Sequence, residues 1–77
     1  MDIKILGGGC PKCNKLEANT RKALDELGIN ADIQKVKETT EIMNLGVMRT
    51  PTLMVDGKAI VTGRVANPRE IKKLLTP

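Results

Sequence analysis

The two cysteines of this chain, Cys10 and Cys13, are separated only by Pro11 and Lys12. Cysteines at this spacing form a reversible disulfide, supply half of a metal site, or act as a structural staple. A staple here would close a very short loop and add only about 2 kcal/mol of stability, less than a longer loop would give. The spacing therefore points to disulfide exchange or metal binding.

The segment that begins at Pro11 favours disulfide exchange. Its apolar residues recur at spacings of three and four, which is typical of an amphipathic helix, and Gly28 ends it. Cys10 then stands at the N-cap and Cys13 at the third helical position. Free N–H groups and the positive end of the helix favour a Cys10 thiolate, which is the nucleophile in disulfide exchange. We predict that Cys10 attacks a substrate disulfide.

Cys13 lies one helical turn after Cys10 and begins the apolar stripe of the helix. We expect it to be buried and less ionised, which suits a thiol that resolves a mixed disulfide on Cys10. The separation fits the Cα distance of roughly 5.5 Å that a disulfide prefers. The simplest interpretation of Lys12 is an ordinary surface lysine, but its charge also favours the Cys10 thiolate.

Three glycines at 7, 8 and 9 precede the pair. They have two interpretations of equal weight. They form a permissive bend, or they let the backbone of another chain approach Cys10 closely.

The elements that must position this motif follow the order β-α-β-α-β-β-α over residues 1–77, which we interpret as a single domain. Alternating polar and apolar residues predict strands at 2–6 and 29–36. Two more strands, at 52–55 and 58–62, are joined by the hairpin turn Asp56-Gly57.

Two further helices are predicted. The first is short, is capped by Thr39 or Thr40 and stops at Gly46. The last begins at Pro68 after an Asn67 cap. Strands joined through a helix run parallel with a right-handed crossover, whereas the last two strands pair antiparallel. The fold class is therefore α/β, with a four-stranded mixed sheet flanked by helices.

The composition restricts the partners. The net charge is +4, but the basic residues are interleaved with acidic ones, and no aromatic residue is present for base stacking. We therefore expect no nucleic acid partner. No apolar run approaches the roughly 20 residues of a membrane helix, and the N-terminus is too mixed for a signal peptide, so we expect a cytoplasmic protein. Without aromatics, Met43, Met48 and Met54 are expected to fill gaps in the core.

The residues Arg49-Thr50-Pro51 precede the third predicted strand. From the residues alone the Thr50–Pro51 bond is expected to be trans, because only about 5–6 % of such bonds are cis. Arg49 is a candidate contact for an acidic substrate, although a solvated loop charge is the more common case.

The Cys10–Cys13 pair at a strand-to-helix junction, Thr50-Pro51 before a hairpin and Gly63 after it together resemble the thioredoxin fold. In motif and length the chain is similar to the small archaeal and bacterial thioredoxin-like proteins called redox-active disulfide proteins. The resemblance implies a cis-proline at Pro51 close to the cysteines. It also implies that the backbone of Thr50 binds substrate and that Gly63 lies near the same groove.

The sequence departs from this family at identifiable positions. Lys12 replaces the aromatic residue of the glutaredoxin motif, and the Gly-Gly and acidic residue that hold glutathione are missing from 63–67. No residue matches the buried aspartate that lies beneath the cysteine pair of thioredoxins. The group that exchanges a proton with Cys13 is therefore unassigned.

We predict a thiol–disulfide oxidoreductase that needs no cofactor and no metal and acts as a monomer on protein disulfides, with an upstream reductase as a second partner. A soft-metal carrier that binds copper or zinc through the cysteine pair is the first alternative. Such domains usually carry Met where Gly8 stands and follow the order β-α-β-β-α-β. A non-catalytic thioredoxin-like binding module is the second alternative function. The direction of electron flow stays open, because related dithiols span about −270 to −120 mV.

Overall fold

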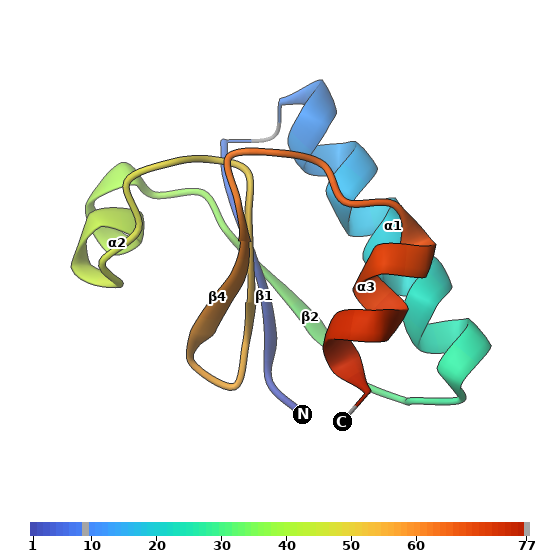
Figure 1. Cartoon of the computed structure of the whole chain (residues 1–77). Helices are drawn as coiled ribbons and strands as arrows, with labels where there is room; N and C mark the ends of the chain where they lie inside the picture. The colour runs from blue at the N-terminus through green and yellow to red at the C-terminus, as the bar shows by residue number, and fades with distance from the viewer. Residues whose placement is uncertain (9, 77) are drawn as a thin grey trace.

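The structure is a computed structural model that describes residues 1–8 and 10–76. Its elements follow the predicted order β-α-β-α-β-β-α. In Figure 1 the sheet separates α2, on one side, from α1 and α3, which pack together on the other. The elements are β1 (Ile3–Leu6), α1 (Pro11–Leu27), β2 (Ile33–Val36), α2 (Thr39–Asn44), β3 (Thr52–Val55), β4 (Lys58–Thr62) and α3 (Pro68–Leu75).

The four strands form one mixed sheet in the order β2-β1-β3-β4. β1 pairs parallel with β2, and β3 pairs antiparallel with β4, as predicted. The Asp56-Gly57 turn has positive φ at both residues, 51° and 84°, as the hairpin turn predicted here requires. β1 and β3 are antiparallel neighbours at the centre of the sheet. The end of β1, which leads toward α1, therefore lies beside the start of β3.

The second strand is shorter than predicted. The alternation suggested a strand over 29–36, but β2 begins only at Ile33. β2 lies at the edge of the sheet, and its neighbour β1 begins at Ile3, directly opposite Ile33. The preceding residues therefore have no strand to pair with, and Ile29 and Ala31 instead pack against the core from a connecting segment.

The larger part of the core fills the space between the sheet and the two long helices. Ile5 and Leu53 of the sheet pack there with Leu16 of α1 and Ile71 of α3. Glycine ends α1 as predicted: Gly28 has φ 69° and its N–H bonds to the carbonyls of the last turn. Asn67 caps α3 through a 2.8 Å bond from the Glu70 N–H.

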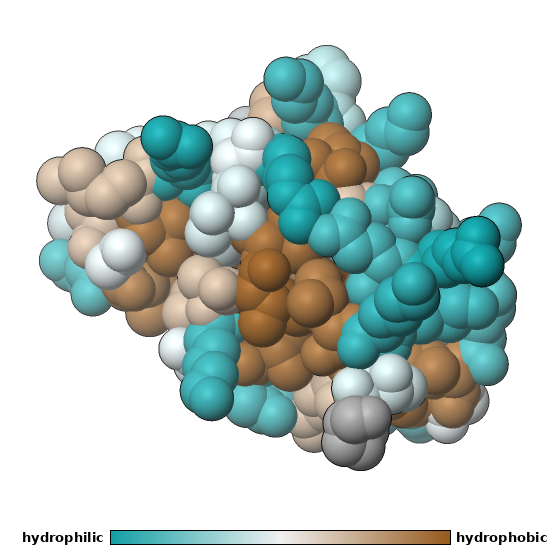
Figure 2. Space-filling view, viewed as in Figure 1, coloured by the Kyte–Doolittle hydropathy of each residue, from teal (hydrophilic) through white to brown (hydrophobic). Residues whose placement is uncertain are grey.

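The face covered by α2 departs most from the prediction. Glu38, without a side-chain cap bond, precedes α2, and the two threonines lie in its first turn instead of capping it. Of the three methionines, only Met54 is buried, whereas Met43 and Met48 are 62 % and 90 % exposed. The expectation that all three fill the core was wrong, because this short helix leaves its flanks open. Figure 2 shows apolar surface over α2.

None of the helices described in residues 1–8 and 10–76 is both long and apolar enough to cross a membrane.

Candidate active site

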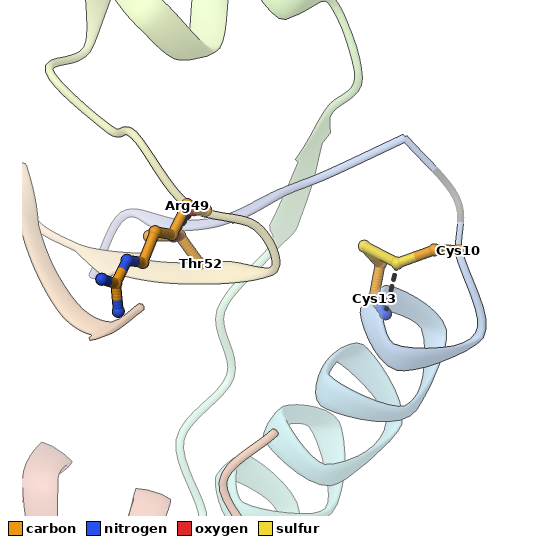
Figure 3. Close-up of a disulfide and its surroundings, with 4 residues drawn as sticks. All are labelled: Cys10, Cys13, Arg49 and Thr52. Carbon is orange, nitrogen blue, oxygen red and sulfur yellow. Dashed lines mark hydrogen bonds between the residues drawn. A yellow bond between two sulfur atoms is a disulfide. The ribbon is translucent and has the colours of Figure 1, made fainter. Parts of the chain in front are cut away.

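The helix N-terminus at Cys10 has the predicted geometry. Cys10 is the N-cap with an extended backbone (φ −68°, ψ 162°), and Pro11 is the first helical residue. The Cys13 N–H donates a hydrogen bond of 3.2 Å to the Cys10 sulfur, drawn as the dashed line in Figure 3. The sulfur therefore meets a donor that has no partner within the helix, the arrangement that favours a negative charge on it.

The two cysteines form a disulfide with a Cα–Cα distance of 5.1 Å. They differ in accessibility, because Cys10 is exposed and Cys13 is only 4 % exposed. This is the asymmetry expected from the apolar stripe. An incoming sulfur can reach Cys10, whereas Cys13 is screened by the protein.

Gly7 brings the cysteines against the Thr50 segment. It continues β1, with its N–H bonded to the Val36 carbonyl at 2.9 Å. A Cβ at this position would overlap the Cys13 sulfur and would lie 3.8 Å from the Thr50 Cβ. Gly7 is therefore required for the close approach of Cys13, which is neither of the two predicted reasons for the glycines.

The other two glycines differ from Gly7. A Cβ on Gly8 would meet nothing within 4 Å, so the surface there is open to an approaching chain. Gly9 lies outside the described residues, and the bend expected over 7–9 is not described in full.

The Thr50–Pro51 peptide bond is cis, as the resemblance implied and contrary to the expectation from the residues alone. Pro51 is buried, and its carbonyl accepts a 2.9 Å hydrogen bond from the Gly63 N–H. The Thr52 hydroxyl donates to the Arg49 carbonyl at 2.5 Å and closes the turn. The structure thus brings Gly63, which follows β4, next to Pro51, and it places Thr50 beside Gly7 and Cys13.

The side chains of Arg49 and Lys12 are less closely associated with the cysteine pair. The Arg49 side chain packs over Gly63, where a Cβ would lie 3.1 Å from the Arg49 Cδ. Figure 3 shows this side chain pointing away from the disulfide. Lys12 is exposed in the first turn of α1. The structure does not bring the Arg49 guanidinium to the cysteine pair.

A groove of about 380 Å³ opens beside the Thr50 segment and was not predicted. Its lining includes Gly8 and Thr50, which belong to the segments near the cysteines, and Lys37, Met43 and Met48. The groove is predominantly apolar, and Lys37 is the basic residue among those described in its lining. The sequence offered one signal for it, since two methionines flank a segment too short to bury both.

A second, much smaller cavity lies beneath the cysteine pair. Its volume is about 10 Å³, and Cys13 and Glu17 of α1 line it together with Lys35 of β2. The Glu17 side chain is 12 % exposed and bonds to Lys35 and Arg21, each at 2.8 Å. The hydrogen bond from Lys35 is the main cause that lowers the pKa of Glu17 below its usual value. Burial opposes this shift and Arg21 reinforces it.

Glu17 was missed by the sequence reasoning. It follows Cys13 by four residues, and residues at this spacing are neighbours on one helix face. That spacing was the available signal. The partner Lys35 comes from another element, and only the folded chain brings it to this site.

Across residues 1–8 and 10–76 no group of three or more Cys, His, Asp or Glu side chains is placed to hold a metal ion. The element order, which ends in α3, also differs from the β-α-β-β-α-β order of the heavy-metal domains considered above.

A disulfide at the N-terminus of the helix that follows the first strand, facing a cis-proline before an antiparallel hairpin, defines a class of proteins: thiol–disulfide oxidoreductases of the thioredoxin fold. Residues 1–76 match the thioredoxin domain family. The chain belongs to this family, and it is a thioredoxin-like disulfide oxidoreductase.

Two relatives agree with this assignment. A thioredoxin of Methanothermobacter thermautotrophicus is 47 % identical over 76 residues, which cover 99 % of either chain. A thioredoxin of Methanocaldococcus jannaschii is 42 % identical over 73 residues, covering 95 % of this chain and 84 % of the relative.

Proposed function

We propose that this protein reduces disulfides of other proteins through a mixed disulfide on Cys10. The supporting observation is the asymmetry of the pair. Cys10 is exposed and its sulfur accepts a hydrogen bond from the Cys13 N–H at the helix terminus, while Cys13 is buried. The exposed sulfur can meet a substrate, and the buried one can meet only Cys10.

The reaction consists of two successive thiol–disulfide exchanges. The Cys10 thiolate attacks one sulfur of the substrate disulfide, a Cys10–substrate disulfide forms, and the other substrate sulfur leaves as a thiolate that takes a proton from solvent. Cys13 then loses its proton and attacks the Cys10 sulfur. The second substrate sulfur leaves as a thiol. The substrate has then gained two electrons, and the protein is oxidised to the Cys10–Cys13 disulfide.

An upstream reductase must then return two electrons to the Cys10–Cys13 disulfide. The two relatives named thioredoxin support both a protein disulfide as substrate and a reductase as partner. A monomeric state and a cytoplasmic location stay predictions, which size-exclusion chromatography with light scattering and localisation of the tagged protein would test.

We assign the substrate contacts to the segment that faces the cysteines. The Thr50 backbone and Pro51 receive the main chain of the substrate, and Gly63 supports this segment through its bond to the Pro51 carbonyl. The groove lined by Met43 and Met48 accepts an apolar side chain next to the substrate disulfide. Arg49 contributes through the shape of the segment, since its side chain packs on Gly63.

Trapping tests the assignment of the two sulfurs. Cys13→Ser should accumulate a covalent adduct with a disulfide-containing protein, because the mixed disulfide on Cys10 cannot be resolved. Cys10→Ser should form none and should lose insulin reduction with dithiothreitol as the electron source. An adduct on Cys10→Ser but not on Cys13→Ser would reverse the assignment.

A redox titration of the intact protein, with mass-tagged thiols counted, tests the function itself. A single two-electron transition at about −270 mV indicates a reductant, whereas one well above about −200 mV indicates an oxidant of the same class. A protein that forms no internal disulfide but holds zinc or copper(I) tightly would be a metal carrier instead.

A further inference from the structure

Methionines are the side chains of this chain that stay open to oxidation once the disulfide has formed. The sequence contains four methionines and two cysteines but no Trp, Tyr or His. Cysteine oxidation begins at a thiolate, and the Cys10–Cys13 disulfide has none. A methionine thioether needs no ionisation before it reacts with an oxidant. The accessibility of each methionine therefore decides where an oxidant acts on the disulfide form of the protein.

Two of the four methionines are exposed in the same groove. Met43 of α2 is 62 % exposed, Met48 is 90 % exposed, and both line the groove that reaches Thr50. Met54 is 5 % exposed, and Met1 is 53 % exposed but lies before β1, outside the described lining of the groove. The chain thus holds two groove methionines, a buried one and an exposed one elsewhere, and the last two serve as internal controls.

The rest of the lining makes this groove sensitive to a change in polarity. Ile42 and Val47 belong to the buried cluster on the α2 face and also line the groove. Figure 2 shows apolar surface over α2. An apolar side chain of a substrate is held there by the apolar area that both surfaces withdraw from water. A sulfoxide is polar, so its formation on a groove methionine removes part of this attraction.

We propose that Met43 and Met48 form a modification site at which a hydroperoxide produces methionine sulfoxides and thereby weakens the docking of protein disulfides. The terminal oxygen of the hydroperoxide bonds to the thioether sulfur, and the O–O bond breaks. The proton moves to the remaining oxygen, which leaves as water or as an alcohol. The sulfur loses two electrons and the hydroperoxide gains them. This assignment rests on the proposed function, because it concerns the groove that receives the substrate there.

The modification acts on docking and leaves the cysteine chemistry intact. Neither Cys10 nor Cys13 is among the described residues that line the groove. The hydrogen bond from the Cys13 N–H to the Cys10 sulfur lies within the first turn of α1 and involves no methionine. A small disulfide that meets only the Cys10 sulfur should therefore react equally fast before and after oxidation. A protein disulfide, which also occupies the groove, should bind more weakly.

The first measurement maps the oxidised positions. The disulfide form is treated with hydrogen peroxide, the peroxide is removed with catalase, and tryptic peptides are analysed by tandem mass spectrometry. Cleavage after Lys and Arg should release Met1 in residues 1–4, Met43 and Met48 in 38–49, and Met54 in 50–58. We expect each groove methionine to gain one oxygen atom at a dose that also oxidises Met1 but leaves Met54 largely unchanged.

The second measurement compares insulin reduction before and after this treatment, with dithiothreitol as the electron source. The KM for insulin should rise about tenfold, because apolar contact area is lost. The rate of the reduced protein with 5,5′-dithiobis(2-nitrobenzoate), a small aromatic disulfide, should stay within about twofold. Methionine sulfoxide reductases that act on both sulfoxide epimers should restore the KM for insulin.

Leucine variants supply the matched controls, since leucine is close to methionine in volume and forms no sulfoxide. In Met43→Leu/Met48→Leu, the KM for insulin after treatment should equal the value of the same variant before treatment, although Met1 is oxidised at this dose. Met54→Leu keeps both groove methionines, and its KM should rise on treatment as that of the wild type does.

Several results would overturn the inference. These are groove methionines that oxidise no faster than Met54, an unchanged KM in the oxidised wild type, and an equal rise of KM in Met43→Leu/Met48→Leu. An equal loss of the reaction with the small disulfide would also overturn it, because oxidation would then act on the cysteine site. An untreated protein that reduces no insulin would instead contradict the proposed function. The two failures are distinguishable, because the peptide map does not depend on activity.

Discussion

The two faces of the sheet are built differently. On the face of α1 and α3, Leu16, Leu53 and Ile71 are each 0 % exposed, and both helices cover the strands. On the face of α2, the buried hydrophobic cluster among the described residues consists of Leu6, Ile42, Val47 and Met54. A helix of six residues covers it and leaves Met43 and Met48 in contact with solvent.

The active site lies where the two faces meet. Cys13 belongs to the closed face, since it begins the buried stripe of α1, whereas the segment from Met48 to Pro51 comes from the open face. Gly7 touches both, because a Cβ there would meet Cys13 and Thr50. The closed face therefore fixes the position of the Cys13 sulfur, and we propose that the open face contacts the substrate.

Core truncations on the two faces should give the largest effects and should differ. Ile71→Ala should lower the free energy of unfolding by about 4 kcal/mol, and Ile42→Ala by about 2 kcal/mol. The first removes a fully buried side chain, and the second removes one at the margin of a small cluster. Urea unfolding followed by far-UV circular dichroism measures both, since the chain has no aromatic residue. Equal losses would mean that the two faces contribute equally to the free energy of unfolding.

Gly7→Ala should disturb the contact between the faces. The added methyl overlaps the Cys13 sulfur, so the sulfur or the strand must shift. A displacement of about 1 Å in a reacting group costs on the order of 100-fold in rate, and we expect this loss in insulin reduction. Gly8→Ala is the control, because its methyl meets nothing within 4 Å, and it should lose far less. Equal activity of the two variants would contradict the steric role of Gly7.

Met48→Ser tests whether the open face contacts a protein substrate. Loss of a large apolar contact should raise KM for a protein disulfide about tenfold, while reaction with a small aromatic disulfide stays within about twofold. Leu74→Ser is the matched control. Leu74 is also an exposed apolar residue, at 43 %, but it lies on α3 and not in the groove. An equal effect of both variants would indicate a general loss of surface hydrophobicity.

The smallest effect concerns the ion pair that ties α1 to β2. The pKa of Glu17 in the folded state is lowered, chiefly by Lys35, so its contribution to stability is present above about pH 4.5 and is lost as the pH falls through the folded-state value. Its partners are largely exposed, so the contribution is below about 1 kcal/mol. Glu17→Gln should be slightly less stable than the wild type at pH 7, and the difference should shrink as the pH falls below about 4.5. A difference that grows in acid would contradict the sign.

Much of the fold was predictable because its signals are local. Proline and glycine at the ends of α1, the Asp56-Gly57 turn and the Asn67 cap each depend on neighbours in the chain, and all three appear as predicted. The start of β2 and the cap of α2 were wrong. Both depend on which neighbours the segment finds after folding. The α2 methionines were misplaced for the same reason, since exposure is a property of packing.

The candidate site divides in the same way. The sequence by itself determined that Cys10 caps a helix and that Cys13 follows it into the core, because helix geometry requires only local spacing. Only the tertiary structure decided what surrounds the pair. It placed Thr50 against Gly7, turned Arg49 away toward Gly63, and brought Lys35 from β2 to Glu17 beneath Cys13. Contacts between distant segments follow from how the sheet and helices pack, and no local pattern in the chain encodes them.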